Sequence, residues 1–212
     1  HFKRRAEVSL WGGRIVVWVS SLLSLFLLVR WSPEFIQTAS GDPAYTYSYH
    51  HIFLTGAQYG SDVLHTGGPW SILYFHLYHP DTFVLSLAGQ AFIALIIGVL
   101  IGDAAKKHLK HWLAQSAFVL GMLALFTVAI DARFFFLALA AVALMPDRQD
   151  KRISPLYISV LAVLALAVLI KSSFFVVAGF VLVMTVFQET IRCRKLPLYS
   201  IAFVVLVIGF HL

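Results

Sequence analysis

Residues 59–70, YGSDVLHTGGPW, hold side chains that could exchange protons, in a chain that is otherwise mostly Leu, Val, Ala and Phe. Asp62 and His65 are an acid and a base three positions apart, and three glycines and a proline accompany them. Glycine permits tight turns and a close approach of one backbone segment to another. Irregular backbone near a bilayer is tolerated where it is buried in protein or lines a wet cavity. We therefore expect residues 59–68 to form an irregular turn, with Asp62 and His65 projecting into such a cavity.

A second polar stretch, residues 41–56, precedes it and predicts a short helix. Asp42 is a good N-cap, Pro43 suits the first helical position, and Gly56 suits the end of the helix. Four residues then share one face at helical spacing: Tyr45, Tyr49, Ile52 and Phe53. We expect this helix to lie along a membrane surface with its tyrosines at the headgroup level. A second short helix is predicted from Pro69 to residue 78.

The composition of the whole chain predicts an all-α, polytopic membrane protein. Sixty per cent of the 212 residues are hydrophobic and only 12% are charged, whereas soluble domains average about 25% charged. The net charge of +6 is interpreted as a marker of cytoplasmic loops, and no nucleic-acid partner is expected. The single cysteine, Cys193, excludes an intrachain disulfide. Seven spans are predicted, at residues 15–30, 82–102, 112–130, 133–145, 156–170, 172–188 and 198–212.

The distribution of basic residues orients these spans. With the N-terminus in the cytoplasm, thirteen of the sixteen basic residues fall in inside segments, and only Arg30, Arg133 and Lys171 lie outside. This orientation requires residues 156–188 to be two helices with a turn at Lys171. Residues 31–81 then form one long outer loop, which is typical of a functional segment. The chain lacks an initial Met and stops within an apolar run, so we expect a fragment with a truncated last span.

The outer loop resembles the first outer loop of the GT-C superfamily of membrane glycosyltransferases, including the dolichyl-phosphate-mannose type. The matching residues are Asp42, Ala44, Tyr45, His50 or His51, Leu54, Gly56, Tyr59, Gly60, Asp62, Thr66, Gly68 and Pro69. The resemblance implies a seven-helix membrane module with two interfacial helices in this loop. It also implies that a sugar is moved from a polyprenyl-phosphate donor to an acceptor on the outer face. Many members carry a second acid beside the first, where this chain has Pro43.

The resemblance implies that Asp42 is the catalytic base, with Asp62 as a second catalytic candidate. Inverting transfer needs a carboxylate to take a proton from the acceptor hydroxyl, and cations to hold the leaving phosphate. Arg133 and Lys171 are the candidate cations, because short flanking helices should recess them into a polar cavity. The further candidates for substrate binding are Tyr45, His50, His51, Tyr59 and His65. No cofactor is expected, and the sequence does not indicate a divalent metal, although it does not exclude one.

Each candidate also has a purely structural interpretation. Asp42 could only cap its helix and Asp62 could only close an Asx-turn. Asp131 and Arg133 could form a local ion pair, and Lys171 could extend to the lipid headgroups.

Two other functions remain open at this point. One is a transporter of lipid-linked sugars, and the other is a non-catalytic subunit that scaffolds a membrane complex. For the leading function we expect an integral protein of a bacterial-type inner membrane, in contact with the bilayer, a lipid-linked donor and an unidentified acceptor.

Overall fold

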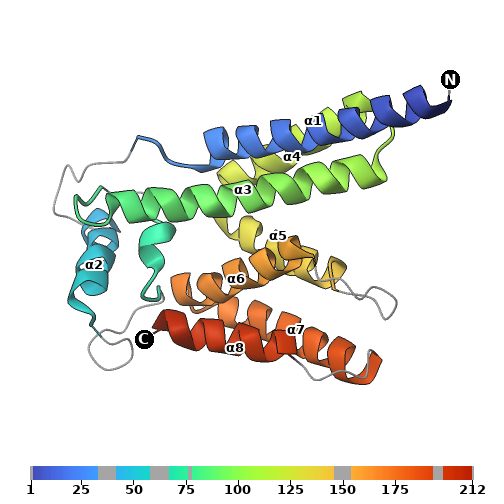
Figure 1. Ribbon diagram of the computed structural model, residues 1–212. Coiled ribbons are helices and arrows are strands. Elements are labelled where there is room, and N and C mark those ends of the chain that lie inside the picture. Colours follow the sequence, from blue (N-terminus) through green and yellow to red (C-terminus); the bar gives the residue numbers. More distant parts are fainter. Residues whose placement is uncertain are drawn as a thin grey trace. The chain divides into compact units, whose positions relative to one another are not determined.

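The computed structural model describes residues 2–32, 42–57, 67–75, 78–145, 154–192 and 198–211, and these fold into helices without any strand (Figure 1). An isolated bridge between Gly67 and Lys171 is the only extended pairing among them. The α-helices are α1 Phe2–Leu28, α2 Asp42–Thr55, α3 Phe83–His108, α4 Trp112–Val128, α5 Ile130–Ala143, α6 Pro155–Ile170, α7 Phe174–Phe187 and α8 Leu198–His211. A 3₁₀ turn, η1, spans Ser71–Leu73, and a π-helical turn, η2, spans Gln188–Arg192.

The chain divides into two compact units, of which the first contains residues 1–30 and 88–133. In this unit α1 and α3 run antiparallel and touch through small residues. The Ser20 hydroxyl donates a hydrogen bond of 2.7 Å to the carbonyl of Gly98. A Cβ at Gly98 or Gly102 would collide with α1, so only glycine permits this separation. Helix α4 adds buried side chains of its own: Val119, Leu123 and Phe126.

The second unit contains residues 31–87 and 134–212. Its helices α6, α7 and α8 pack against one another around apolar side chains that are almost fully buried: Val160, Leu164, Ala178, Val181 and Phe203. Helix α2 packs against η1, and η1 packs against α6. This arrangement attaches the predicted outer loop to the end of α6, where Lys171 follows.

One described helix, α3, is long and apolar enough to cross a membrane by itself. The apolar parts of α1, α4, α6 and α7 are shorter, at 10 to 17 residues. An all-helical chain is therefore confirmed for the described residues, and seven spans stay a prediction. The break between two helices at Lys171 lies where the charge distribution predicts it, since α6 ends at Ile170 and α7 begins at Phe174.

Two local predictions are corrected. The helix expected at residues 69–78 is reduced, within its described part, to the single turn η1. The N–H groups of Gly68 and Trp70, where the predicted helix begins, donate to carbonyls of α6, and the described bonds within the segment are limited to residues 68–75. The break implied between the predicted spans 112–130 and 133–145 lies earlier, at Ala129, so Asp131 and Arg133 occupy the first turn of α5. An acid there suits the positive end of the helix dipole.

Candidate functional site

Residues 67–71 bind the C-terminal end of α6 through backbone and hydroxyl donors. The Gly68 N–H donates to the Ile170 carbonyl at 3.0 Å, and the Trp70 N–H donates to the Leu169 carbonyl at 3.1 Å. The Ser71 hydroxyl also reaches the Ile170 carbonyl, at 2.7 Å. Carbonyls in the last turn of a helix lack partners within the helix. The segment therefore caps α6, and it is fixed there by bonds that a freely moving loop would not make.

Glycine is required at two adjacent positions at the start of this contact, Gly67 and Gly68. A Cβ on Gly67 would overlap the ring of Tyr49 and the hydroxyl of Ser71, and a Cβ on Gly68 would overlap the carbonyl of Leu169. The predicted role of these glycines, close approach of one backbone to another, is confirmed. It also explains a polar, glycine-rich stretch in so apolar a chain.

Lys171 lies at the same junction. Its backbone leaves α6 in an extended conformation, with φ −149° and ψ 122°, and pairs with Gly67 in the isolated bridge. Its ammonium group lies 5.2 Å from the ring centre of Tyr74 and 5.8 Å from that of Phe174. A cation over aromatic faces is attracted by their quadrupoles. The half-buried lysine is thus held at the point where the outer-loop segment meets the α6–α7 turn.

Helix α2 begins at Asp42, one residue before the first helical position that the sequence predicts, and its side chains at residues 42–46, including Tyr45, lie outside the described part. At its other end Gly56 has φ 65°, and the Ala57 N–H bonds back to the Ile52 carbonyl at 3.3 Å, which is the predicted helix stop. Tyr59, Asp62 and His65 lie outside the described residues, so their predicted roles stay predictions.

One face of α2 is buried in protein instead of facing headgroups. Tyr49 is 2% exposed and stacks on Phe75 with ring centres 4.9 Å apart. Phe53 meets Trp70 edge to face at 5.4 Å. The shared face predicted from the spacing is therefore present in its described members, Tyr49, Ile52 and Phe53, and it holds residues 67–75. The interfacial position of α2 stays a prediction.

The two adjacent histidines of α2 have different environments. His51 is exposed, whereas His50 is buried, with its Nδ1 2.6 Å from the hydroxyl of Thr82. The ring of His50 stacks on the ring of His79, with ring centres 5.4 Å apart. The ring centre of Tyr47 lies 5.3 Å from that of His79. This group ties α2 to the start of α3. Thr82 was missed by sequence reasoning, although a threonine next to the start of a helix is a recognisable capping signal.

Arg133 belongs to the first unit, where its guanidinium donates from Nε to the Phe126 carbonyl at 2.9 Å and from Nη1 to the Leu28 carbonyl at 3.4 Å. Both carbonyls lie near helix C-termini, where a cation also complements the helix dipole. These bonds give Arg133 a structural role. Its predicted role in substrate binding stays a prediction.

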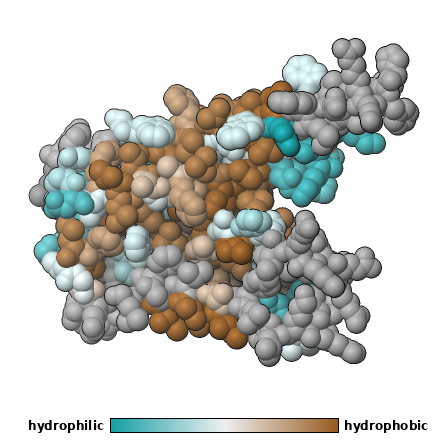
Figure 2. All heavy atoms as spheres, in the orientation of Figure 1, coloured by the Kyte–Doolittle hydropathy of each residue, from teal (hydrophilic) through white to brown (hydrophobic). Residues whose placement is uncertain are grey.

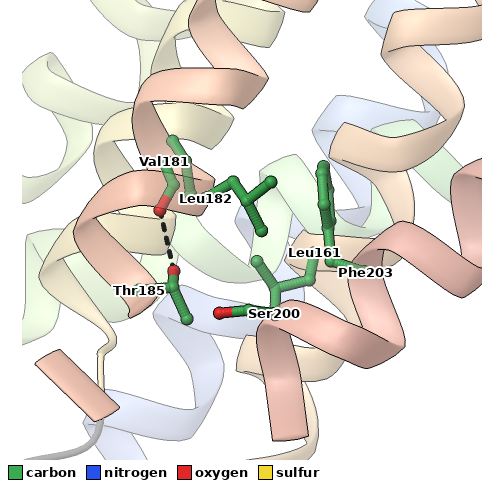
Figure 3. A pocket seen from close by; sticks show the side chains of 6 residues that line it. All are labelled: Leu161, Val181, Leu182, Thr185, Ser200 and Phe203. Carbon is green, nitrogen blue, oxygen red and sulfur yellow. Dashed lines mark hydrogen bonds between the residues drawn. The ribbon is translucent and has the colours of Figure 1, made fainter. Parts of the chain in front are cut away.

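A narrow pocket between α6, α7 and α8 is too tight to hold a water molecule (Figure 3). The Thr185 hydroxyl in its wall donates to the Val181 carbonyl at 2.8 Å. The Ser200 hydroxyl donates to the Glu189 carboxylate at 3.2 Å. We interpret this pocket as a packing defect with satisfied hydroxyls. Among the described residues, no three His, Cys, Asp or Glu side chains are grouped closely enough to hold a metal ion.

Comparisons with protein-family models, with curated proteins and with solved structures found no match. Function must therefore be inferred from the contacts above and from the motif in residues 42–69.

Proposed function

We propose that the chain is an integral membrane protein whose helices lie in a lipid bilayer. Large apolar side chains are exposed along its helices, among them Val128 at 87%, Val176 at 77% and Phe26 at 73%. Apolar residues cover much of the described surface in the view of Figure 2. A protein in water rarely exposes such extended apolar area, whereas lipid chains solvate it without cost.

The contact between α1 and α3 supports the same proposal. Lipid tails are as apolar as leucine, so helices in a bilayer associate through close packing of small residues. Gly98 and Gly102 are spaced four apart and face Ser20 across the contact. From the basic residues we infer a cytoplasmic N-terminus, in a membrane like the bacterial inner membrane.

Within this membrane protein we propose a glycosyltransferase of GT-C type. The observation that carries the proposal is the junction of residues 67–71 with the end of α6. It brings Lys171 to a segment that follows His65 by two positions and Asp62 by five. Transfer from a sugar phosphate needs a cation and acid–base groups near one another, and the pairing of Lys171 with the segment that follows Asp62 and His65 supports such a site.

The proposed step is a single displacement at the sugar's anomeric carbon. An acceptor oxygen forms the new bond to that carbon while the bond from the carbon to the donor phosphate oxygen breaks. The proton of the acceptor hydroxyl passes to the carboxylate of Asp42, with Asp62 as the alternative base. The polyprenyl phosphate leaves with an added negative charge, which Lys171 stabilises. Tyr45, His50, His51, Tyr59, His65 and Arg133 stay candidates for substrate contacts.

Reconstituted transfer tests this proposal. The chain, in its full natural length, is placed in liposomes with a panel of polyprenyl-phosphate sugars and a membrane extract as acceptor, and radiolabelled product is counted. We expect transfer from at least one donor. Movement of a lipid-linked sugar across the bilayer without transfer would support a transporter instead, and neither activity with any donor would support a scaffolding subunit.

A further inference from the structure

The connection between α3 and α4 carries an exposed basic cluster that the proposed transfer reaction does not use. Its cationic or potentially cationic members are all exposed: Lys106, Lys107, His108, Lys110 and His111. Asp103 is the only acid in residues 88–130, and it pairs with Lys107 at 2.6 Å. No acidic side chain in the described part of the chain forms an ion pair with Lys106 or Lys110. Within the described side chains, these two lysines are therefore left to attract an external anion.

Apolar side chains follow the cluster immediately. Trp112 is 70% exposed and Leu113 is 63% exposed, directly after Lys110 and His111. Tryptophan is enriched where membrane meets water, because its ring is apolar and its N–H is polar. A soluble anion would have no use for these two side chains. A phospholipid would use both parts, with its phosphate on the lysines and its glycerol and acyl region on Trp112 and Leu113.

The connection is also held in one conformation. The Leu109 N–H continues the helix by bonding to the Ala105 carbonyl at 3.0 Å. The side-chain amide of Gln115 then donates to the Leu109 carbonyl at 2.8 Å, while its backbone N–H bonds to the His111 carbonyl at 3.0 Å. These bonds close the turn across the basic residues, so a ligand would meet cations on a backbone that is already ordered.

We infer that this connection is a binding surface for the headgroup of an anionic phospholipid. The inference rests on the membrane location proposed above, and it does not depend on sugar transfer. α3 is the described helix long enough to cross a bilayer, and its last turn carries Lys106 and Lys107. The cluster therefore lies where such a helix would emerge among the headgroups. Each lysine near an anionic surface contributes about fivefold in affinity.

Lipid titration tests the inference. The full chain in neutral detergent micelles is titrated with phosphatidylglycerol or with phosphatidylcholine, and bound lipid is counted by native mass spectrometry. We expect the variant Lys106→Gln/Lys110→Gln to bind phosphatidylglycerol about 25-fold more weakly, with phosphatidylcholine binding unchanged. Asp103→Asn releases Lys107 from its partner and should strengthen phosphatidylglycerol binding several-fold.

A matched pair of single variants separates this surface from a general charge effect. Lys110→Gln and Arg30→Gln each remove one positive charge, and only Lys110→Gln should weaken phosphatidylglycerol binding. Equal weakening by the two, or unaltered binding by the double lysine variant, would overturn the inference. Displacement of the lipid by millimolar inorganic phosphate or by a short oligonucleotide would also overturn it, in favour of a soluble anion.

The membrane proposal fails by a different observation, namely release of the chain from membranes by alkaline carbonate. A chain that stays inserted but shows no preference for phosphatidylglycerol would contradict only the lipid surface.

Discussion

Two contacts in this protein depend on glycine, and they differ in what the backbone does there. At the contact of α1 with α3, Gly98 and Gly102 lie within a regular helix, and their lack of side chains lets two helices approach. At the contact of residues 67–71 with α6, Gly68 lies in irregular backbone, and its N–H bonds to the Ile170 carbonyl. The first contact packs two helix surfaces together. The second supplies hydrogen-bond donors to the last carbonyls of α6 and fixes the segment beside Lys171.

This difference predicts which substitutions should change stability alone and which should also change function. A regular helix bonds its own backbone, so changes at the α1–α3 contact should alter stability alone. The irregular segment owes its position to contacts with α6, so changes there should alter both stability and the geometry around Lys171. Changes of chemical groups in the proposed site should alter function alone.

The largest expected effect is that of Asp42→Asn. Asparagine caps a helix about as well as aspartate, so α2 should be retained. The amide cannot accept the proton of the acceptor hydroxyl, and loss of a general base lowers rates by about 10²–10⁴-fold. We expect transfer in liposomes to fall by this factor, with the thermal unfolding midpoint almost unchanged.

Normal transfer by the Asp42→Asn protein would assign the base to Asp62, and Asp62→Asn is the matched variant. A large fall in the unfolding midpoint instead would make Asp42 a structural residue.

The next effect concerns the cation. Lys171→Met keeps an unbranched apolar chain over Tyr74 and Phe174 but removes the charge that is proposed to hold the donor phosphate. A hydrogen bond to a charged group contributes about 1.5–3 kcal/mol, so donor affinity should fall by about 10- to 100-fold. Lys171→Arg retains the positive charge and should keep most of the donor affinity. If Lys171 only extends to the lipid headgroups, Lys171→Met should leave the donor concentration at half-maximal rate unchanged.

Sequence reasoning succeeded where a signal is local. The start of α2, within one residue of the predicted position, and its stop at Gly56 were both predicted from capping chemistry within a few residues. The break at Lys171 followed from charge, because one long helix would have moved three basic residues to the outer side. The contact made by Gly98 and Gly102 was missed, although two small residues four positions apart in an apolar helix are a known signal of helix packing.

Sequence reasoning failed where a partner lies far along the chain. The pattern after Pro69 predicts a helix, but Ser71 and its neighbours bond to carbonyls about a hundred positions later. The environment of Arg133 is equally non-local, since one of its carbonyl partners is Leu28. No local pattern reveals such pairings with helix ends, whereas the proposed contact of Arg133 with a phosphate stays a prediction.

A three-way glycine series tests the central comparison directly. Gly68→Ala places a methyl group against the Leu169 carbonyl in irregular backbone, and overpacking of this kind destabilises by about 1–3 kcal/mol. Gly98→Ala meets α1 in the same way, but alanine gains about 1 kcal/mol of helix propensity that offsets part of the cost. Gly121→Ala has no neighbour within 4 Å and should be neutral or stabilising.

Denaturant titration in detergent measures the free energy of unfolding of the three variants, which should fall most for Gly68→Ala, less for Gly98→Ala and not at all for Gly121→Ala. Donor binding is assayed on the same proteins. Only Gly68→Ala should also weaken donor binding, because it displaces the segment beside Lys171. The comparison fails if Gly98→Ala weakens donor binding as much.

The smallest expected effects belong to a pair of serines, one at each contact. The Ser71 hydroxyl reaches the Ile170 carbonyl and the Ser20 hydroxyl reaches the Gly98 carbonyl, each at 2.7 Å. Ile170 ends α6 and has no following helical turn to donate to it, whereas Gly98 lies within α3. Ser71→Ala should therefore lower the free energy of unfolding by about 1 kcal/mol, and not by more, because the Gly68 N–H still serves the same carbonyl. Ser20→Ala should cost less, about 0.6 kcal/mol, as is usual for hydrogen bonds between membrane helices. The reverse order in denaturant titrations would mean that the α1–α3 contact depends on its hydroxyl, and that close packing through glycine is not sufficient to hold it.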